Sequence, residues 1–277
     1  MNKKIEKLAY DIRKGIIDAV ASKGGGHLGG TLDLAEVLAV LYGEFMNVNP
    51  ENPKWEERDY LICSKGHAGP AIYATLAAKG FFPYEWLYTL NQGGTILQGH
   101  CDRRVPGVDA TTGSLGQGLS IASGLALGCK KSESKQKVFC IIGDGELDEG
   151  QNWEAAQFAA HYKLNNLIAF LDWNKKQIDG TNEEVMKLGD VSSKFYSFGW
   201  NATVVDGKNI AEIRSAIAQA LISADRPSMI ILDTVKGAGV PFIEKIENNH
   251  CIGLSKELAA KAIEQLNEQA QKIGLEV

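Results

Sequence analysis

The segment IIGDGELDEG, residues 141 to 150, crowds four acidic side chains into six positions after an apolar run. The four acids are Asp144, Glu146, Asp148 and Glu149. Carboxylates this close together repel one another unless a positive charge lies among them. Gly143 and Gly145 flank Asp144, and a glycine on each side lets the backbone approach a ligand closely. The segment therefore indicates a bound cation beside Asp144 or, as the alternative, a solvent-exposed loop.

A second polar signal follows the next apolar run. Asn174, in LDWNKKQIDG, comes thirty positions after Asp144. An acid and an amide at adjacent strand ends can reach one point in space, and such oxygen ligands suit Mg²⁺ or Ca²⁺ and not zinc. Mg²⁺ usually completes its octahedron with phosphates and water, and a helix beginning near Gly150 would favour an anion. The pair predicts a divalent cation and a diphosphate beside Asp144.

Histidines in glycine-rich segments are the third chemical signal. His27 lies in GGGHLGG and His100 in QGHCD, where neighbouring glycines leave the rings unshielded. A near-neutral pKa suits proton transfer, and ring nitrogens also donate to hydroxyl groups. A lone histidine in a loop is more often incidental than catalytic. Four of the five histidines, however, lie in glycine-flanked or loop segments, and only His161 lies in a predicted helix.

The composition argues against several classes of protein. The 277 residues, 44% hydrophobic and 23% charged, are typical of a soluble globular protein. A net charge of −5 argues against nucleic-acid binding, because no basic surplus is present to neutralise phosphates. Five scattered cysteines without a CxxC pair indicate a reducing compartment. Since no signal peptide and no long uncharged stretch is present, we expect a cytoplasmic protein outside the membrane.

Alternating strands and helices must position these residues. Apolar runs predict five strands, beginning near residues 59, 138, 167, 202 and 228. Helical patterns cover residues 3–22, 33–45, 114–130, 150–163, 210–224 and 255–273. This alternation predicts an α/β fold, a doubly wound, mostly parallel sheet with helices on both faces. We expect a single domain over residues 1–277, with ligands at the carboxyl edge of the sheet.

Several motifs together resemble the transketolase family. GDG, followed about thirty residues later by the asparagine of LDWNKKQIDG, resembles the thiamine diphosphate binding motif. The segments GDGELDEG, SKGHA, QGHCD and TTGSLGQG are similar to those of transketolases, and the resemblance runs from Lys14 to about His250. NKKQIDG and the short length resemble the amino-terminal subunit of a split, two-chain transketolase.

The resemblance implies a role for each matching residue. Asp144 and Asn174 would bind Mg²⁺, or Ca²⁺, through their side chains, and Lys176 through its backbone carbonyl. The residues implied to bind thiamine diphosphate are His67, Gly113, Leu115, Gly143, Asp144, Gly145, Glu146, Asn174, Ile178, Lys236 and His250. The implied catalytic histidines are His27 and His100, which would bond the first hydroxyls of a ketose donor, and His67 and His250 beside the diphosphate. Glu149 and Glu154 would lie at a subunit interface.

The resemblance also implies a reaction and a partner. The chain would transfer a two-carbon ketol unit from a ketose phosphate to an aldose acceptor. No segment resembles the pyrimidine-binding or carboxy-terminal domains of full-length transketolases, and we expect those on a separate carboxy-terminal subunit, in an α₂β₂ assembly. The resemblance also implies that a glutamate of the missing pyrimidine-binding domain activates the cofactor. Three glutamates in predicted helices of this chain are interpreted as solvated, namely Glu6, Glu36 and Glu44, and we therefore expect the chain alone to be inactive. The initial Met and the closing helix lead us to expect a natural chain end.

Other functions remain open. The chain could be another thiamine diphosphate enzyme subunit, similar to 1-deoxyxylulose-5-phosphate synthase or to the α subunit of a 2-oxo acid dehydrogenase, although the GGH and QGH motifs favour sugars. A non-catalytic, cofactor-binding regulatory subunit is a second alternative, and the intact Asp144, Asn174, His67 and His250 argue against it. A nicotinamide-binding protein is a third, but GGGHLGG follows a helix and lacks GxGxxG spacing.

Overall fold

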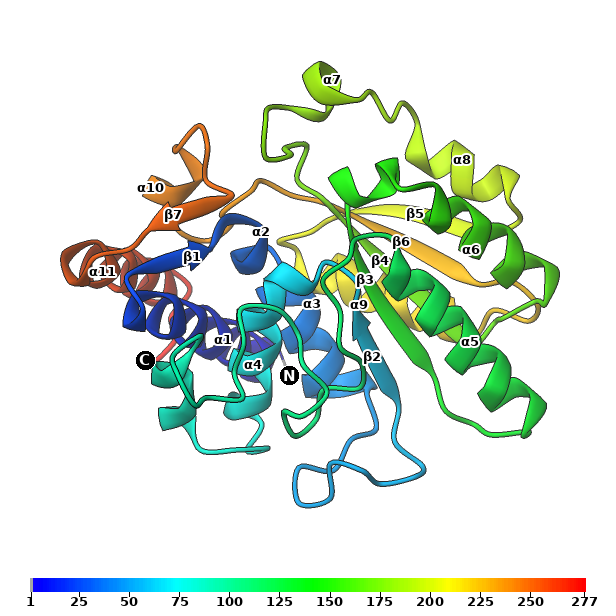
Figure 1. Cartoon of the computed structure of the whole chain (residues 1–277), viewed down its shortest axis with the longest axis horizontal. Helices are drawn as coiled ribbons and strands as arrows, with labels where there is room; N and C mark the ends of the chain where they lie inside the picture. The colour runs from blue at the N-terminus through cyan, green and yellow to red at the C-terminus, as the bar shows by residue number, and fades with distance from the viewer. Residues whose placement is uncertain (1) are drawn as a thin grey trace.

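Five parallel strands form the central sheet of the molecule (Figure 1). The structure, a computed structural model, describes residues 2–277. The strands lie side by side in the order β2-β3-β4-β6-β5, and every neighbouring pair is parallel. They are β2 Tyr60–Cys63, β3 Val138–Gly143, β4 Leu167–Trp173, β5 Asn201–Asp206 and β6 Ser228–Asp233. The five predicted strands are confirmed.

Helices cover both faces of this sheet (Figure 1). The helices of one face are α5 Gln117–Lys131, α6 Gly150–His161 and α8 Val191–Ser197. Those of the other side are α1 Asn2–Ser22, α3 Ala35–Val40, α4 Gly69–Ala78 and α9 Ile210–Leu221, with α11 Lys256–Lys272 packed against α1. Short helices are α2 Gly29–Leu32, α7 Asn182–Val185 and α10 Pro241–Glu244. None of the helices in residues 2–277 combines the length and the hydropathy needed to cross a membrane.

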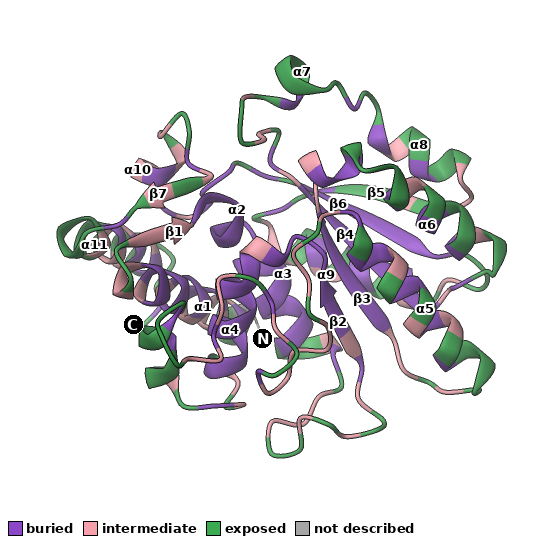
Figure 2. Ribbon diagram, in the orientation of Figure 1, coloured by how far each residue is buried: buried purple, intermediate pink, exposed green. Residues whose placement is uncertain are grey.

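Two hydrophobic cores lie on opposite sides of the sheet, because successive side chains of a strand point to opposite faces. Phe139 and Ile141 of β3 join the core beneath α1, α3 and α9, whereas Cys140 and Ile142 join the core beneath α5 and α6. The central strands are buried along almost their whole length (Figure 2). This burial on both faces explains the continuous apolar runs in the sequence and confirms the predicted α/β fold.

Two features did not follow from sequence periodicity. Helix α4 is apolar around its whole circumference and buried almost throughout, so its sequence has no amphipathic pattern. Strands β1 Gly25–His27 and β7 Cys251–Gly253 form a separate antiparallel pair far apart in sequence. Gly25, at φ +145°, lies so close to this partner strand that a Cβ would be 2.5 Å from the Ile252 carbonyl oxygen. The pairing brings the glycine-rich segment of His27 beside His250.

The prediction that Glu36 is solvated is wrong. Helix α3 is buried on all sides, and the Glu36 carboxylate accepts a hydrogen bond from the Arg13 guanidinium at 2.5 Å. A buried carboxylate needs such a partner, because burial without one is costly. Glu44 is exposed and pairs with Arg214, and Glu6 is partly exposed, so these two fit the prediction better.

Candidate functional site

A cavity of about 330 Å³ lies at the carboxyl edge of the sheet. Loops that follow β2, β3, β4 and β6 meet there with residues of β1 and the segment before β7 (Figure 1). The predicted residues that line it are His27, His67, His100, Gly113, Leu115, Gly143, Asp144, Gly145, Glu146, Asn174, Lys176, Ile178, Lys236 and His250. All predicted catalytic, cofactor-binding and cation-binding residues therefore surround one space.

Asp144 is buried at the end of β3, with 3% of its surface exposed. Its Oδ1 accepts from the Gly145 backbone N–H at 2.8 Å, and its Oδ2 accepts from the Lys175 N–H at 2.6 Å and the Asn182 amide at 2.9 Å. Burial, reinforced by the charge of Asp172, raises the pKa of Asp144. Since its hydrogen-bond donors are all neutral, its charged form would gain from a cation in the cavity.

The other three acids of IIGDGELDEG lie in different surroundings. Glu146 is buried, and its carboxylate accepts from the Ser64 hydroxyl and from the Gly116 and Gly143 backbone N–H groups at 2.8 and 2.9 Å. Burial raises the pKa of Glu146. Asp148 and Glu149 are exposed to solvent. The repulsion expected from the sequence is therefore reduced, because two of the four carboxylates are buried among hydrogen-bond donors and the other two are exposed to water.

Asn174 and Lys176 present two further oxygens at the end of β4. Asn174 Oδ1 accepts from the Lys176 backbone N–H at 3.1 Å. The Lys176 carbonyl accepts from the Lys236 ammonium at 2.8 Å, so a cation already contacts the predicted metal-binding carbonyl. Burial, with the charge of Lys65, lowers the pKa of Lys236.

The donor set of this corner of the cavity fits a hard divalent cation. It combines one carboxylate, one amide oxygen and one backbone carbonyl, the oxygen ligands that Mg²⁺ and Ca²⁺ take. Within residues 2–277, no group of three or more histidine, cysteine, aspartate or glutamate side chains could hold a metal ion.

Lys65, which lines the cavity, forms a buried ion pair with Asp172 behind it, and neither residue was predicted as part of the site. The Lys65 ammonium lies 2.5 Å from Asp172 Oδ2 and also donates to the Gly30 carbonyl at 2.6 Å. Lys65 is 2% and Asp172 0% exposed. Burial favours the neutral form of Lys65, but Asp172 and Asp33 outweigh it and raise the pKa of Lys65. The SKGHA motif could have indicated a role for Lys65, because a lysine next to a loop with a predicted site histidine can pair with an acid at a strand end.

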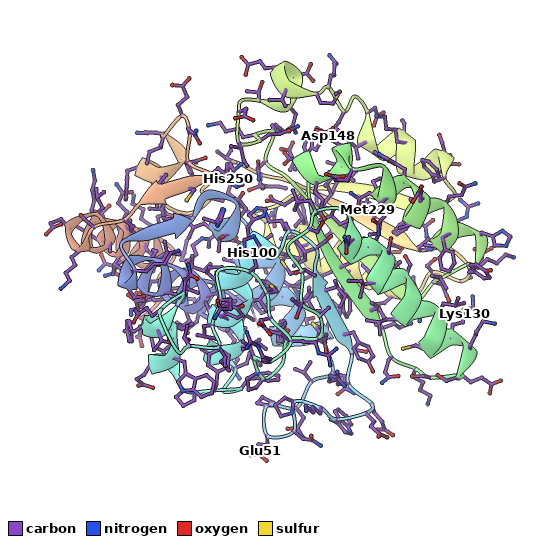
Figure 3. All side chains as sticks on the ribbon, in the orientation of Figure 1. Glu51, His100, Lys130, Asp148, Met229 and His250 are labelled. Carbon is purple, nitrogen blue, oxygen red and sulfur yellow. The ribbon has the colours of Figure 1, made fainter. Side chains whose placement is uncertain are left out.

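Four histidines from four separate segments surround the cavity. The ring of His27 lies 5.3 Å from that of His67, 5.7 Å from that of His100 and 5.2 Å from that of His250, between centroids. His67 and His250 are 5.0 Å apart. His100 and His250 approach from distant parts of the chain (Figure 3). Nδ1 of His250 is buried without a partner, so it is available to a ligand.

The surroundings of these rings keep two of them neutral. Burial and the Lys65 ammonium lower the pKa of His67 to about 2. Burial and the Lys236 ammonium lower the pKa of His250 to about 3. Burial also lowers the pKa of His27. At neutral pH the rings of His67 and His250 can therefore accept hydrogen bonds from ligand hydroxyls without adding positive charge.

Acid is expected to destabilise the chain through His67 and His250. Their folded pKa values lie below the unfolded value of 6.5, so their contribution to stability is present above pH 6.5 and is lost as pH falls toward 3. Between pH 7 and pH 5 the loss should be roughly 1–2 kcal/mol per histidine. Urea unfolding of a His67→Gln/His250→Gln variant should show a correspondingly smaller decrease. A His161→Gln control, at an exposed position of α6, should behave as the parent, and an unchanged pH response in the double variant would contradict this assignment.

Glycine and apolar residues form the remaining walls. A Cβ at Gly113 would lie 3.3 Å from His100 Cδ2, so a side chain there would push against the ring. A Cβ at Gly145 would lie 3.0 Å from the Gln177 side chain. Ile178 lies on the wall with 58% of its surface exposed, and Leu115 is half-buried. An exposed isoleucine on a cavity wall offers apolar contact to a flat ring.

The predicted interface residues lie outside the cavity. Glu149 precedes α6 and Glu154 lies on it, and both are exposed. Their place at a subunit interface stays a prediction.

A groove of about 490 Å³ between α1, α9 and α11 is larger but chemically poorer. Its buried Arg13 and Glu36 neutralise each other, and none of the histidines contributes to it. The cavity at the sheet edge is therefore the better candidate for chemistry.

Comparison with known proteins places the chain in one family. Residues 5–274 match the family model described as "Transketolase, thiamine diphosphate binding domain". The chain is 49% identical over 266 residues to the 6-deoxy-6-sulfo-D-fructose transketolase subunit SqwG of Clostridium sp. (strain MSTE9), covering 96% of this chain and 97% of that protein. It is 38% identical over 264 residues to an apulose-4-phosphate transketolase subunit of Phocaeicola vulgatus, covering 95% of this chain and 94% of that protein.

A solved transketolase shares the fold at greater total length. The transketolase structure from Campylobacter jejuni matches with a TM-score of 0.89 and 32% identity, over 100% of this chain and 46% of that one. The chain thus spans less than half of that enzyme, but nearly all of the two subunits named above. Since the family match covers the cavity and all its loops, the chain belongs to the transketolase family, as its amino-terminal thiamine diphosphate binding part.

Proposed function

We propose that this chain is the amino-terminal subunit of a two-chain transketolase, which moves a two-carbon ketol unit from a ketose to an aldose acceptor. One observation carries the proposal. Four histidines converge on the same cavity as the oxygens of Asp144, Asn174 and Lys176. Sugar hydroxyls and a cation-bound diphosphate are the ligands that such a combination suits.

Asp144, Asn174 and the Lys176 carbonyl would hold Mg²⁺, with Ca²⁺ as a substitute. The Lys236 ammonium, now on the Lys176 carbonyl, would bind the diphosphate instead. Glycines on the walls let the cofactor approach the backbone, and Leu115 and Ile178 would contact its rings. When bound, thiamine diphosphate supplies the electron sink for breaking the bond between carbons 2 and 3 of the ketose.

The histidines would align the sugar. His27 and His100 would form hydrogen bonds with the first hydroxyls of the ketose donor. These bonds would orient the carbonyl of the ketose toward the cofactor. His67 and His250 stay neutral, so Nδ1 of His250, which has no partner among the described residues, would accept a hydrogen bond from a ligand hydroxyl.

The names of similar proteins support a partner subunit. Relatives of the same length are named as transketolase subunits, and a solved transketolase is more than twice as long. We propose that a carboxy-terminal subunit supplies the pyrimidine-binding domain, and that two copies of each form an α₂β₂ assembly with Glu149 and Glu154 at the contact between like chains.

The substrate class is proposed from the SqwG relative, whose name specifies a 6-deoxy-6-sulfo-D-fructose donor. We propose a ketose with an anionic terminal group, either a sulfonate or a phosphate. The test compares ketol transfer from sulfofructose and from fructose 6-phosphate, using the chain with its co-expressed carboxy-terminal subunit and added thiamine diphosphate and Mg²⁺. Transfer from either donor supports the proposal, and the faster donor identifies the terminal group. No transfer from any ketose by the assembled complex would overturn it.

A further inference from the structure

The amide of Asn174 is held from behind by two buried carboxylates. Its Nδ2 donates to Asp172 Oδ2 at 2.9 Å and to Asp33 Oδ2 at 3.1 Å. Asp33 is 1% exposed, Asp172 is 0% and Asn174 itself 6%. These acids lie outside the set of residues that line the cavity.

This arrangement fixes which way the amide faces. A side-chain amide has two N–H donors on one atom and one acceptor oxygen on the other. If the amide of Asn174 flipped, both hydrogen bonds would be lost and its oxygen would face the Asp172 carboxylate, which repels it. Burial and the charge of Asp172 raise the pKa of Asp33, so the repulsion comes chiefly from Asp172. Oδ1 is therefore held away from the acids, where it accepts from the Lys176 N–H and keeps a second lone pair for a ligand.

Both acids are in turn held by neighbouring loops. Asp33 Oδ1 accepts from the Gly237 and Ala238 backbone N–H groups at 2.7 and 3.0 Å. Asp172 Oδ2 accepts from Lys65 at 2.5 Å. Asn174 is thereby tied to the loop that carries Lys236 and to the loop that carries His67.

Stability does not explain why these charges are buried. A buried ion pair is often no more stabilising than apolar side chains of similar volume. Asp172 Oδ1 is also buried without a hydrogen-bond partner, which adds to the cost of burying this carboxylate. A role in orienting Asn174 would explain why these charged side chains are buried although apolar side chains could stabilise the fold equally well.

We propose that Asp33 and Asp172, with Lys65 balancing the charge of Asp172, are positioning residues that aim Asn174 Oδ1 at the divalent cation. This inference rests on the proposed function, because it assumes that a cation binds at Asp144 and Asn174. None of the three residues need touch the cation or the substrate. Supporting groups of this kind commonly change metal affinity by about 10- to 100-fold.

The test measures Mn²⁺ affinity by the electron paramagnetic resonance signal of free Mn²⁺, in the presence of thiamine diphosphate and the carboxy-terminal subunit. In Asp33→Asn, the new oxygen can still accept from Gly237 and Ala238, so its amide nitrogen faces the Asn174 nitrogen. The hydrogen bond from Asn174 to residue 33 is then lost, and only Asp172 Oδ2 still opposes a flip of the Asn174 amide. We expect Mn²⁺ affinity to fall about 10- to 100-fold in Asp33→Asn and in Asp172→Asn. Thermal unfolding shows whether each variant is folded. If Asp172→Asn does not fold, the Mn²⁺ affinity of Asp33→Asn alone tests the positioning role.

Asp109→Asn is the matched control. The Asp109 side chain is 7% exposed, pairs with Arg58 at 2.9 Å and binds the Leu61 N–H near the start of β2, at the opposite edge of the sheet. It should lower stability without changing Mn²⁺ affinity. If folded Asp33→Asn binds Mn²⁺ as tightly as the parent, the positioning role is wrong while the cation site stands. If the parent binds no Mn²⁺, the proposed cation site itself fails and this inference fails with it.

Discussion

The Asp144→Asn variant is expected to lose more than about 100-fold in affinity for thiamine diphosphate with Mg²⁺, since outer partners of a metal alone change affinity by about 10- to 100-fold. Asp144 supplies the one carboxylate of the proposed donor set, and the substitution removes its charge while keeping its shape. The amide oxygen can still accept from the Lys175 N–H, so the loop after β3 should keep its fold. Calorimetric titration of the chain with its carboxy-terminal subunit measures the affinity.

Asp148→Asn is the matched control for this result. Asp148 belongs to the same acidic segment, but it is exposed and accepts only from the Gln177 side chain at 2.9 Å among the hydrogen bonds of the described residues. The Asp148→Asn variant should bind the cofactor as tightly as the parent. Equal binding by Asp144→Asn and the parent would mean that the acids of IIGDGELDEG hold no cation.

The Lys65→Met variant is expected to lose about 3–5 kcal/mol of unfolding free energy, because it leaves the buried Asp172 carboxylate without its cation. Asp172 has no exposed surface through which water could replace the ammonium. Urea unfolding at pH 7 measures the loss.

Two further variants separate charge from packing. Lys65→Met/Asp172→Asn removes both charges of this ion pair and should recover most of the lost stability, but not the cation affinity. Lys187→Met removes an ion pair with Glu183 in which both side chains are more than 60% exposed, and should lower the stability far less than Lys65→Met does. A Lys65→Met variant as stable as Lys187→Met would show that Asp172 is not held as a buried anion.

The sequence predicted the sheet because its strands are buried on both faces. VFCIIG has no charged or hydroxyl side chain and LIAFLDW has only Asp172, and this apolar signal is strongest where helices cover both sides of a strand. Asp144 and Asn174 were found because parallel strands end at one edge, so residues far apart in sequence must meet there.

The support beneath the site could not be predicted in the same way. Lys65 comes from the loop after β2, Asp172 from the end of β4 and Asp33 from the turn between α2 and α3, and sequence periodicity does not predict that these three residues touch. Glu146 was named among the residues that bind thiamine diphosphate, but the sequence did not predict that its carboxylate turns inward to accept from the Ser64 hydroxyl and two backbone N–H groups. Glu36 was misjudged for a related reason, since its burial depends on helices that pack around α3 from distant parts of the chain. Pairings of this kind are set by tertiary contacts and not by periodicity.

The most direct test of the account is a calorimetric titration of thiamine diphosphate with Mg²⁺ into this chain, first alone and then with its carboxy-terminal subunit. The account places the cation and diphosphate site on this chain and the pyrimidine site on the partner. It therefore predicts tight binding only when both subunits are present. Absence of binding heat under both conditions would contradict the account, because the cavity around Asp144 and Asn174 would then hold no cofactor.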